Sequence, residues 1–187
     1  MSILVIAEHD NQKLKGSTLN TVAAASKLTG EVSILIAGSG IDAVVSESQT
    51  LNEISKIVTC DNNVYENFIA EDLSSLVVAI SDGYTHILAP SSTFGKNLMP
   101  RVAAKLDTQQ ISDIISVESD DTFKRPIYAG SCIATVKSND AVKVITVRST
   151  AFDPVGTDNN GVEVVSVDAS DSLVISSFVS ELSLIHI

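Results

Sequence analysis

Hydroxyl and basic side chains gather in residues 90–105, where an apolar run passes into a helical pattern. Three hydroxyl residues (91–93) precede a glycine, and Lys96 and Arg101 follow it. Backbone N–H groups at the start of a helix attract anions, so this arrangement is typical of a site for a phosphate or another anion. The alternative interpretation is structural: a Ser or Thr caps the helix, and Pro100 makes a local bend in it.

The histidines and cysteines do not complete a catalytic set. His9 follows the first apolar run, at the edge where open α/β sheets place ligands, and is therefore a candidate functional residue. His86 lies within the fourth apolar run and is interpreted as a core residue. Cys60 and Cys132 lie 72 positions apart and match no metal-binding or CxxC spacing, as expected of small buried side chains in a reducing compartment. One histidine in a loop, without a paired nucleophile, is weak evidence for catalysis.

The first 107 residues alternate short apolar runs with stretches of helical period. This alternation predicts a parallel sheet whose strands are joined by right-handed helical crossovers. Residues 38–40 read Gly-Ser-Gly but lack the third glycine of a dinucleotide-binding fingerprint, so they are interpreted as a turn. The expected strands are residues 3–7, 32–37, 57–59 and 85–89, and the expected helices run from Ser17 to Gly30, through residues 41–45, over 71–80 and from about 93 to 106.

The pattern changes after Leu106, where short β runs separated by polar turns replace the helical stretches. Such runs predict antiparallel strands added to one edge of the parallel sheet after about residue 114, with a hairpin at 138–140. Residues 153–161 are polar with Gly and Pro, which is typical of a linker. The expected β runs are residues 114–117, 123–128, 133–136 and 142–147, with a further strand at 162–167 and a short helix at 172–181.

Composition limits the classes of function. The chain has 187 residues, enough for one domain with its own core, and a net charge of −11, which argues against nucleic acid and anionic membranes as partners. No basic residue follows Arg148, so the last 39 residues carry six of the net negative charges. The chain starts directly on its first apolar run and has no apolar stretch near the ~20 residues of a membrane span, so we expect a cytoplasmic protein.

Five motifs occur in a fixed order along the chain. They are Leu4-Val5-Ile6-Ala7-Glu8-His9, Phe94-Gly95-Lys96-Asn97-Leu98 through Pro100-Arg101-Val102-Ala103-Ala104-Lys105, Ile111-Ser112-Asp113-Ile114, Ile127-Tyr128-Ala129-Gly130 and Thr146-Val147-Arg148. In this order and at this spacing, they resemble the amino-terminal domain of electron transfer flavoprotein alpha subunits over about residues 2–155. One departure from the family pattern is the serine and cysteine that follow the fourth motif, where the family commonly has asparagine.

The resemblance implies a fold, partners and a cofactor. The expected fold is an α/β three-layer sandwich with a mostly parallel sheet, like the adenine nucleotide alpha hydrolases. The expected role is a scaffold that docks the beta subunit and is not itself a catalyst. The complete heterodimer would accept electrons from acyl-CoA and related dehydrogenases on FAD and pass them through a quinone oxidoreductase toward the quinone pool. The residues expected to define the interface or the fold are Phe94, Gly95, Lys96, Asn97, Pro100 and Arg101.

The resemblance also implies a division of the chain. Residues 1–153 are expected to form the amino-terminal domain, and residues 154–181 to lead toward a separate domain that supplies most FAD contacts, so that FAD is not held by this part alone. Residues 182–187, Leu-Ser-Leu-Ile-His-Ile, match the translation of a common transposase sequencing adapter, CTG TCT CTT ATA CAC ATC. They are interpreted as foreign to the gene, and a short natural apolar terminus is the alternative.

Two other classes of function remain open from the residues. A free-standing module of the universal-stress type would bind AMP or ATP at the turn of residues 91–96, although the glycine-rich phosphate loop of that group is missing. A cysteine-dependent redox enzyme would need groups that stabilise a thiolate near Cys60 or Cys132, and the sequence supplies none.

Overall fold

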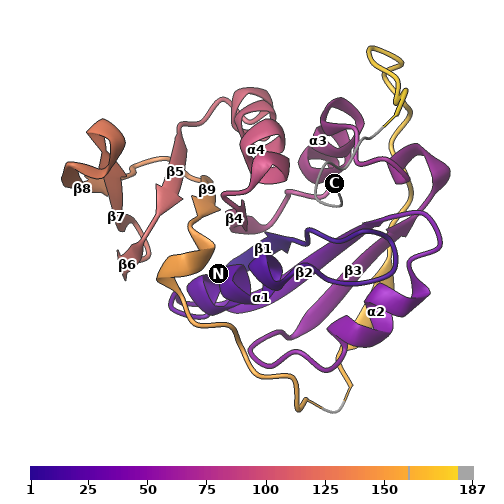
Figure 1. The fold of residues 1–187 in the computed structure, drawn as a ribbon, viewed down its shortest axis with the longest axis horizontal. Helices are drawn as coiled ribbons and strands as arrows, with labels where there is room; N and C mark the ends of the chain where they lie inside the picture. Colours follow the sequence, from indigo (N-terminus) through magenta and orange to yellow (C-terminus); the bar gives the residue numbers. More distant parts are fainter. Residues whose placement is uncertain (160, 181–187) are drawn as a thin grey trace, which may run out of the picture.

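The computed structural model describes residues 1–159 and 161–180. Its main body is a sheet of seven strands in the order β10-β3-β2-β1-β4-β9-β5, and all neighbouring pairs are parallel (Figure 1). The strands are β1 (Ser2–Ile6), β2 (Glu31–Gly38), β3 (Lys56–Asp61), β4 (Tyr84–Pro90), β5 (Gln110–Ile114), β9 (Lys143–Val147) and β10 (Glu163–Ser166).

Helices cover both faces of this sheet and make a three-layer sandwich. The core on one face contains residues of α1 and α2, and the core on the other contains residues of α3 and α4. The four α-helices are α1 (Gly16–Ala25), α2 (Asp42–Ser48), α3 (Ala70–Ala79) and α4 (Thr93–Lys105), and three short 3-10 helices are η1 (Asn63–Tyr65), η2 (Tyr128–Gly130) and η3 (Ser149–Ala151).

The central strands are buried on both faces, which explains their continuous apolar sequences. Four of the five residues of β1 are buried, and so are seven of the eight of β2. Side chains of alternate residues enter the two cores, because successive residues of a strand point to opposite faces. Ile3 and Val5 belong to the core under α1, and Leu4 and Ile6 to the core under α3 and α4.

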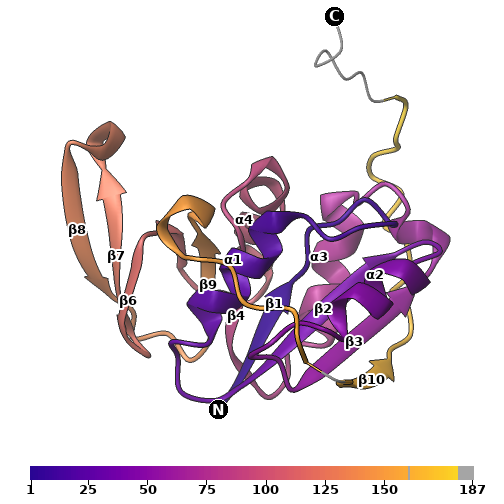
Figure 2. The ribbon, with the colours of Figure 1, turned by 60° about the horizontal axis from the view of Figure 1, so that its bottom comes forward.

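A second, antiparallel sheet stands beside the main one. It has three strands in the order β6-β7-β8, and Figure 2 shows it next to the body rather than on either helical layer. Its strands are β6 (Ser116–Ser119), β7 (Thr122–Ile127) and β8 (Cys132–Lys137). The predicted α/β class, with a mostly parallel sheet and antiparallel strands after about residue 114, is confirmed. The prediction that these strands extend one edge of the parallel sheet is wrong, because they pair with one another in a sheet of their own.

Several local predictions are wrong. Residues 138–140 do not form a hairpin, because β8 pairs only with β7, whereas β9 enters the main sheet in parallel between β4 and β5. The expected run at 114–117 is divided between the end of β5 and the start of β6. The first helix ends at Ala25 rather than Gly30, and a turn fills the gap. Residues 172–180 contain no helix.

Residues 154–181, expected as the linker toward a separate domain, contain a strand of the main sheet. The strand expected at 162–167 is confirmed as β10, which pairs with β3 from Glu163 opposite Lys56 to Ser166 opposite Thr59. A boundary near residue 153 stays a prediction, and residues 182–187, interpreted as adapter-derived, lie outside the described residues.

Candidate functional site

The crevice between β1 and β4, at the carboxyl end of the sheet, is the place where this fold can hold a ligand. The chain leaves β1 toward α1 on one face and leaves β4 toward α4 on the other, so the two loops diverge. Open α/β sheets place ligands at such a switch point. A cavity of about 350 Å³ opens there, and its walls are Glu8, His9, Asn67, Phe68, Thr93, Phe94 and Asn97.

The turn from β4 into α4 is fixed by a cap and a close backbone approach. Ser92 is the N-cap of α4, and its hydroxyl accepts a hydrogen bond from the Gly95 N–H at 3.5 Å. A Cβ atom at Gly95 would lie 1.9 Å from the carbonyl oxygen of Pro90, so only glycine fits. The capping interpretation of this segment is therefore confirmed for Ser92, and the helix continues past Pro100 to Lys105.

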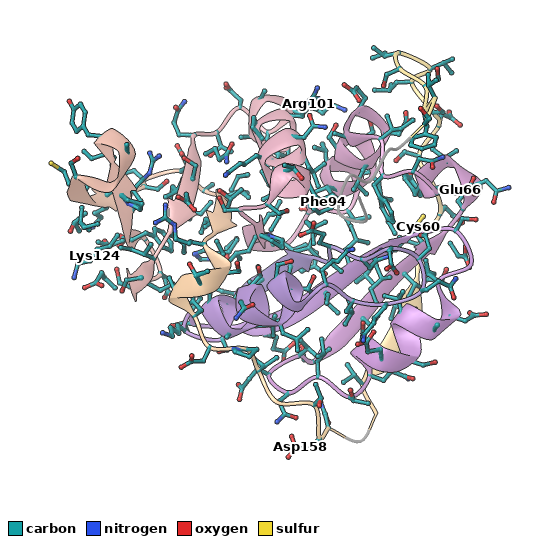
Figure 3. All side chains as sticks on the ribbon, viewed as in Figure 1. Cys60, Glu66, Phe94, Arg101, Lys124 and Asp158 are labelled. Atoms are coloured by element: carbon teal, nitrogen blue, oxygen red, sulfur yellow. The ribbon has the colours of Figure 1, made fainter. Side chains whose placement is uncertain are left out.

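The six residues expected to define the interface or the fold separate into four groups: Phe94 in a ring contact, Asn97 and Arg101 in a polar network, Gly95 buried, and Lys96 and Pro100 exposed. Phe94 lies at the sheet end of α4 and Arg101 lies further along the helix (Figure 3). The Phe94 ring meets Phe68 edge-to-face at 6.4 Å. The Arg101 guanidinium donates to the Asn97 side chain at 2.6 Å and to Glu71 of α3 at 2.9 Å. An interface role for these residues stays a prediction.

His9 is held in the wall of the crevice as a neutral side chain. It is 5% exposed, and its ring meets Phe68 edge-to-face at 4.9 Å. Burial lowers the pKa of His9 to about 4, and the carbonyl of Ala37 and the charge of Asp10 offset only part of that effect. Nδ1 accepts a hydrogen bond from the Asn11 N–H at 3.1 Å, so the unprotonated nitrogen is already engaged. An imidazole in this state has little capacity to act as a general base at neutral pH.

The other groups of the β1 loop are engaged in structural contacts. Ser17 donates to the Glu8 carboxylate at 2.9 Å, and the buried Thr18 hydroxyl donates to the Glu8 carbonyl at 3.0 Å. These bonds fix the start of α1 against the end of β1, as the predicted helix start at Ser17 and Thr18 requires.

The turn interpretation of Gly-Ser-Gly is confirmed, because the chain bends at residues 39–40 directly after β2 and Gly40 has a φ of 66°. Gly38 is the last residue of β2, and a Cβ there would lie 2.1 Å from Oδ1 of Asn11.

Sequence reasoning missed an ion pair between two of the family motifs. The guanidinium of Arg148, at the end of β9, holds both carboxylate oxygens of Asp113, with Nε 3.2 Å from each. Asp113 has a φ of 61° in the irregular part of β5. Burial raises the pKa of this carboxyl, but the hydrogen bonds from Arg148 and the charges of Arg148 and Lys96 outweigh burial and lower it. The sequence signal that pointed toward this pair was the position of Arg148 directly after the apolar run 142–147.

The remaining sequence candidates lie away from the crevice. His86 is buried in β4 as predicted, where Nε2 bonds the Asp120 carbonyl at 2.7 Å. Cys60 is buried, whereas Cys132 is exposed, so the prediction of burial is wrong for Cys132. Burial, with smaller contributions from Asp168 and Asp61, raises the pKa of the Cys60 thiol to about 11, which opposes thiolate chemistry.

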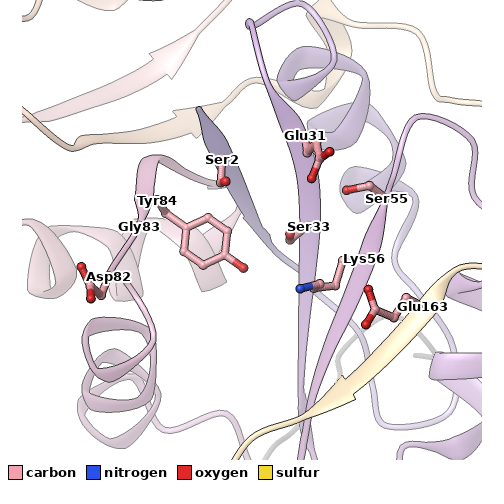
Figure 4. Close-up of a pocket in the computed structure, with 9 residues that line it drawn as sticks. All are labelled: Ser2, Glu31, Ser33, Ser55, Lys56, Asp82, Gly83, Tyr84 and Glu163. Atoms are coloured by element: carbon pink, nitrogen blue, oxygen red, sulfur yellow. The ribbon is translucent and has the colours of Figure 1, made fainter.

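A second cavity, of about 490 Å³, lies at the amino-terminal edge of the sheet (Figure 4). The Lys56 ammonium and the Tyr84 hydroxyl point toward one another across it, Glu163 lies beside Lys56, and Glu31 lies nearer to Ser55. With Asp82, three carboxylates accompany one ammonium group, so the wall has a net negative charge. Within residues 1–159 and 161–180, no three His, Cys, Asp or Glu side chains are arranged to hold a metal ion.

These observations define a class of protein: a three-layer parallel α/β domain with an attached antiparallel sheet and a crevice at the carboxyl end of its main sheet. The electron transfer flavoprotein domain is the family that matches, over residues 3–172. The chain belongs to the electron transfer flavoprotein family.

The curated relatives are alpha subunits. The chain is 48% identical over 181 residues to the electron transfer flavoprotein subunit alpha of Pseudomonas aeruginosa, covering 97% of this chain and 59% of that protein. It is 44% identical to the mitochondrial alpha subunit of Dictyostelium discoideum, covering 97% of this chain and 53% of the relative. The alpha subunit of Bradyrhizobium diazoefficiens is also 44% identical, and the corresponding shares are 97% and 57%. The chain thus spans between half and three fifths of the length of these relatives.

Proposed function

We propose that this chain is part of an electron transfer flavoprotein alpha subunit, which works as a heterodimer with a beta subunit in the cytoplasm. The heterodimer accepts electrons from acyl-CoA and related dehydrogenases on FAD and passes them through a quinone oxidoreductase toward the quinone pool. The observation that carries the proposal is the match to alpha subunits along 97% of the chain. Among the described residues, no helix is long and apolar enough to cross a membrane.

Within the heterodimer, residues 1–153 act as a scaffold rather than as a catalyst. Charged side chains at this end of the sheet support this role, because their ion pairs and hydrogen bonds are made within the fold. Arg148 holds Asp113, Arg101 holds Glu71, and Glu8 accepts hydrogen bonds from the start of α1. Residues 154–181 then lead toward a separate FAD-binding domain.

The crevice does not fit a dinucleotide. Of the residues that line it, the only charged one is Glu8, whose carboxylate would repel a diphosphate. Lys96 is the basic residue nearest in the sequence to Thr93 and Phe94, which line the crevice, and it lies close enough to Asp113 for its charge to lower the pKa of that carboxyl. The same repulsion argues against the free-standing AMP- or ATP-binding module. FAD is therefore held by other parts of the heterodimer.

The beta subunit docks on the antiparallel sheet in this proposal. Tyr128 and Ile133 flank its β7–β8 turn and are 80% and 54% exposed, which is unusual for side chains of this size away from a partner. Tyr128, Ala129 and Gly130 are three consecutive residues with positive φ, and such a costly backbone holds the exposed tyrosine in a fixed direction. Strand β8 lies at the edge of its sheet, so one side of its backbone is free to pair.

Co-expression with the beta subunit tests the proposal. We expect the tagged chain to retain the beta subunit in a pull-down, and the Ile133→Lys variant to lose most of it. Val179→Lys, which also places a charge at an exposed apolar position, is the matched control and should bind as the unmodified chain does. No co-purification with the unmodified chain, or equal binding by both variants, would contradict the docking assignment.

A flavin titration tests the proposal that FAD is held by other parts of the heterodimer. The purified chain should be colourless and show no tight, saturable FAD binding in fluorescence quenching. A yellow protein with bound FAD would contradict the assignment of the cofactor to other parts of the heterodimer.

A further inference from the structure

The segment that follows β10 crosses the end of the sheet and lies along α3 (Figure 1, yellow). We call residues 167–176 the strap. Its first residue, Val167, donates its N–H to the Thr59 carbonyl at 2.9 Å, and Ser170 donates its N–H to the Tyr65 hydroxyl at 3.0 Å. At its far end, Ser176 donates to the Glu71 carboxylate at 3.2 Å. The strap is thus attached by separate hydrogen bonds to β3, to η1 and to the first turn of α3, and not by a continuous ladder of backbone hydrogen bonds.

The strongest of these points is Asp72, in the first turn of α3. Its carboxylate accepts the Leu173 N–H at 2.7 Å and the Ser172 hydroxyl at 3.2 and 3.3 Å. Asp72 is only 5% exposed, although Ser172 and Leu173 are themselves exposed. A carboxylate at the start of a helix is stabilised by the helix dipole, and its hydrogen bonds are among the stronger ones in a protein.

The strap covers part of the core that faces α3. Val167 and Ala169 pack against the cluster that contains Cys60 and Tyr65, and Cys60 is 1% exposed. Asp168 is close enough to Cys60 for its charge to raise the pKa of the thiol. Cys60 is therefore covered on one side by a segment that polar contacts hold, whereas the sheet and helices enclose its other sides.

We propose that the strap opens as a unit while the main sheet stays folded, with Asp72 as its latch, and that opening exposes Cys60. Every residue from 171 to 180 is exposed, so few apolar contacts resist the movement. Removing the latch carboxylate raises the population of the open form and leaves the closed structure of the sheet unchanged. Cys60 serves only as the reporter of this movement.

Thiol labelling of the 187-residue chain measures the opening directly. All variants carry Cys132→Ser, so that Cys60 is the remaining thiol. At low urea concentrations, we expect the labelling rate of Cys60 to change little with urea, because a local opening exposes little new surface. At higher concentrations, the rate should rise steeply with urea, because global unfolding then exposes the thiol. Asp72→Ala should raise the low-urea rate by about tenfold or more, because it removes hydrogen bonds to a charged group.

Two variants keep the test decisive. Asp42→Ala is the matched control, since Asp42 is also a first-turn aspartate but lies on α2, away from the strap, and it should leave the rate unchanged. Ser172→Ala removes one donor and keeps the carboxylate, so it should raise the rate even if Asp72→Ala does not fold. Labelling that follows global unfolding at every urea concentration, or a rate that neither strap variant raises, overturns the proposal.

Discussion

The main sheet and the antiparallel sheet are built from similar β-rich sequences but differ in how they are covered. In β1, four of five residues are buried between two helical layers, whereas β8 has no buried residue. The main sheet therefore contains its own source of stability, since apolar burial is the dominant favourable term in folding. The antiparallel sheet instead depends on a few attachments to the body and leaves a surface for a partner.

Those attachments are few and specific. Phe123 of β7 is fully buried in the core under α1, and it ties the antiparallel sheet to the body through packing. Asp120, in the β6–β7 turn, accepts the Thr29 N–H at 2.7 Å through its side chain and bonds His86 through its carbonyl.

The partly buried Val117 and Val136 pack against the same core, and Arg125 of β7 donates a hydrogen bond to Ser112 of β5 at 2.7 Å. The difference between the two sheets teaches that a small number of contacts, with Phe123 the largest buried side chain among them, hold an otherwise exposed sheet in place.

Replacing Phe123 should give the largest effect in this comparison. Phe123→Ala is expected to lower the free energy of unfolding by about 3–5 kcal/mol, because it removes a fully buried ring and leaves a cavity. Tyr128→Ala, in the same sheet but exposed, should change it by less than about 0.5 kcal/mol. Urea unfolding followed by circular dichroism measures both, and equal effects would contradict the idea that the sheet is held at Phe123.

Acidification should destabilise the body through His9. Its folded-state pKa of about 4 lies below the usual value of 6.5, so the unfolded chain binds a proton more readily. The stabilisation that comes from the lowered pKa of His9 is complete above pH 6.5 and is lost as the pH falls toward 4. This loss lowers the free energy of unfolding by about 3 kcal/mol at most. Unfolding measured between pH 7 and 4.5 should show a weaker dependence in His9→Phe. An unchanged slope in that variant would assign the dependence elsewhere, for example to His86.

The Asp113–Arg148 pair should give an intermediate effect. Arg148→Ala is expected to cost about 1 kcal/mol, because the two side chains are 43% and 25% exposed and solvent screens their attraction. The contact of the guanidinium with both carboxylate oxygens places this pair above one with a single contact. Because the folded-state pKa of Asp113 is lowered, the pair stabilises the protein above the usual pKa of the carboxyl and loses this effect as the pH falls through the lowered value. In Asp113→Asn, the free energy of unfolding from urea titrations should fall less steeply as the pH is lowered from 5 to 2. An unchanged fall in this variant would show that other carboxyls cause it.

The Arg101–Glu71 pair between α3 and α4 should give the smallest effect. The two side chains are 40% and 24% exposed, so solvent screens their attraction. A double-mutant cycle with Arg101→Ala and Glu71→Ala is expected to give a coupling below about 1 kcal/mol. A larger coupling would mean that the α3–α4 surface is desolvated in solution.

The sequence predicts the main sheet better than the antiparallel one for a physical reason. A strand buried on both faces must be continuously apolar, so residues 3–7 and 32–37 are visible from their composition alone. The positions of β9 and β8 depend on which strands they pair with, and those strands can be distant in the sequence. A β run has the same local pattern whichever strand it pairs with, so the pattern does not reveal the partner. The predicted hairpin at 138–140 was wrong because β9 pairs with β4, more than fifty residues earlier, and not with its neighbour.

The site could be predicted only in part for the same reason. The cap at Ser92 and the need for a glycine at 95 follow from local chain geometry, which a sequence pattern reveals. The Asp113–Arg148 pair joins residues 35 positions apart through a strand irregularity, and the strap reaches Asp72 from about 100 positions away. The wrong helix at 172–180 has a related cause, since Ser172, Leu173 and Ser176 bond to Asp72 and Glu71 of α3, about 100 positions away, rather than to their neighbours in a helix.

The pairing of β10 with β3 also constrains how the chain folds as it is made. Strand β3 ends at Asp61, but its outer neighbour ends at Ser166, so the ribosome must add 105 residues before that edge is covered. At about 5–20 residues per second, the β3 edge stays open for roughly 5–20 s of synthesis. An uncovered apolar edge of this kind is a template for pairing with other chains, so the nascent protein passes through a period in which it depends on chaperones or on low local concentration.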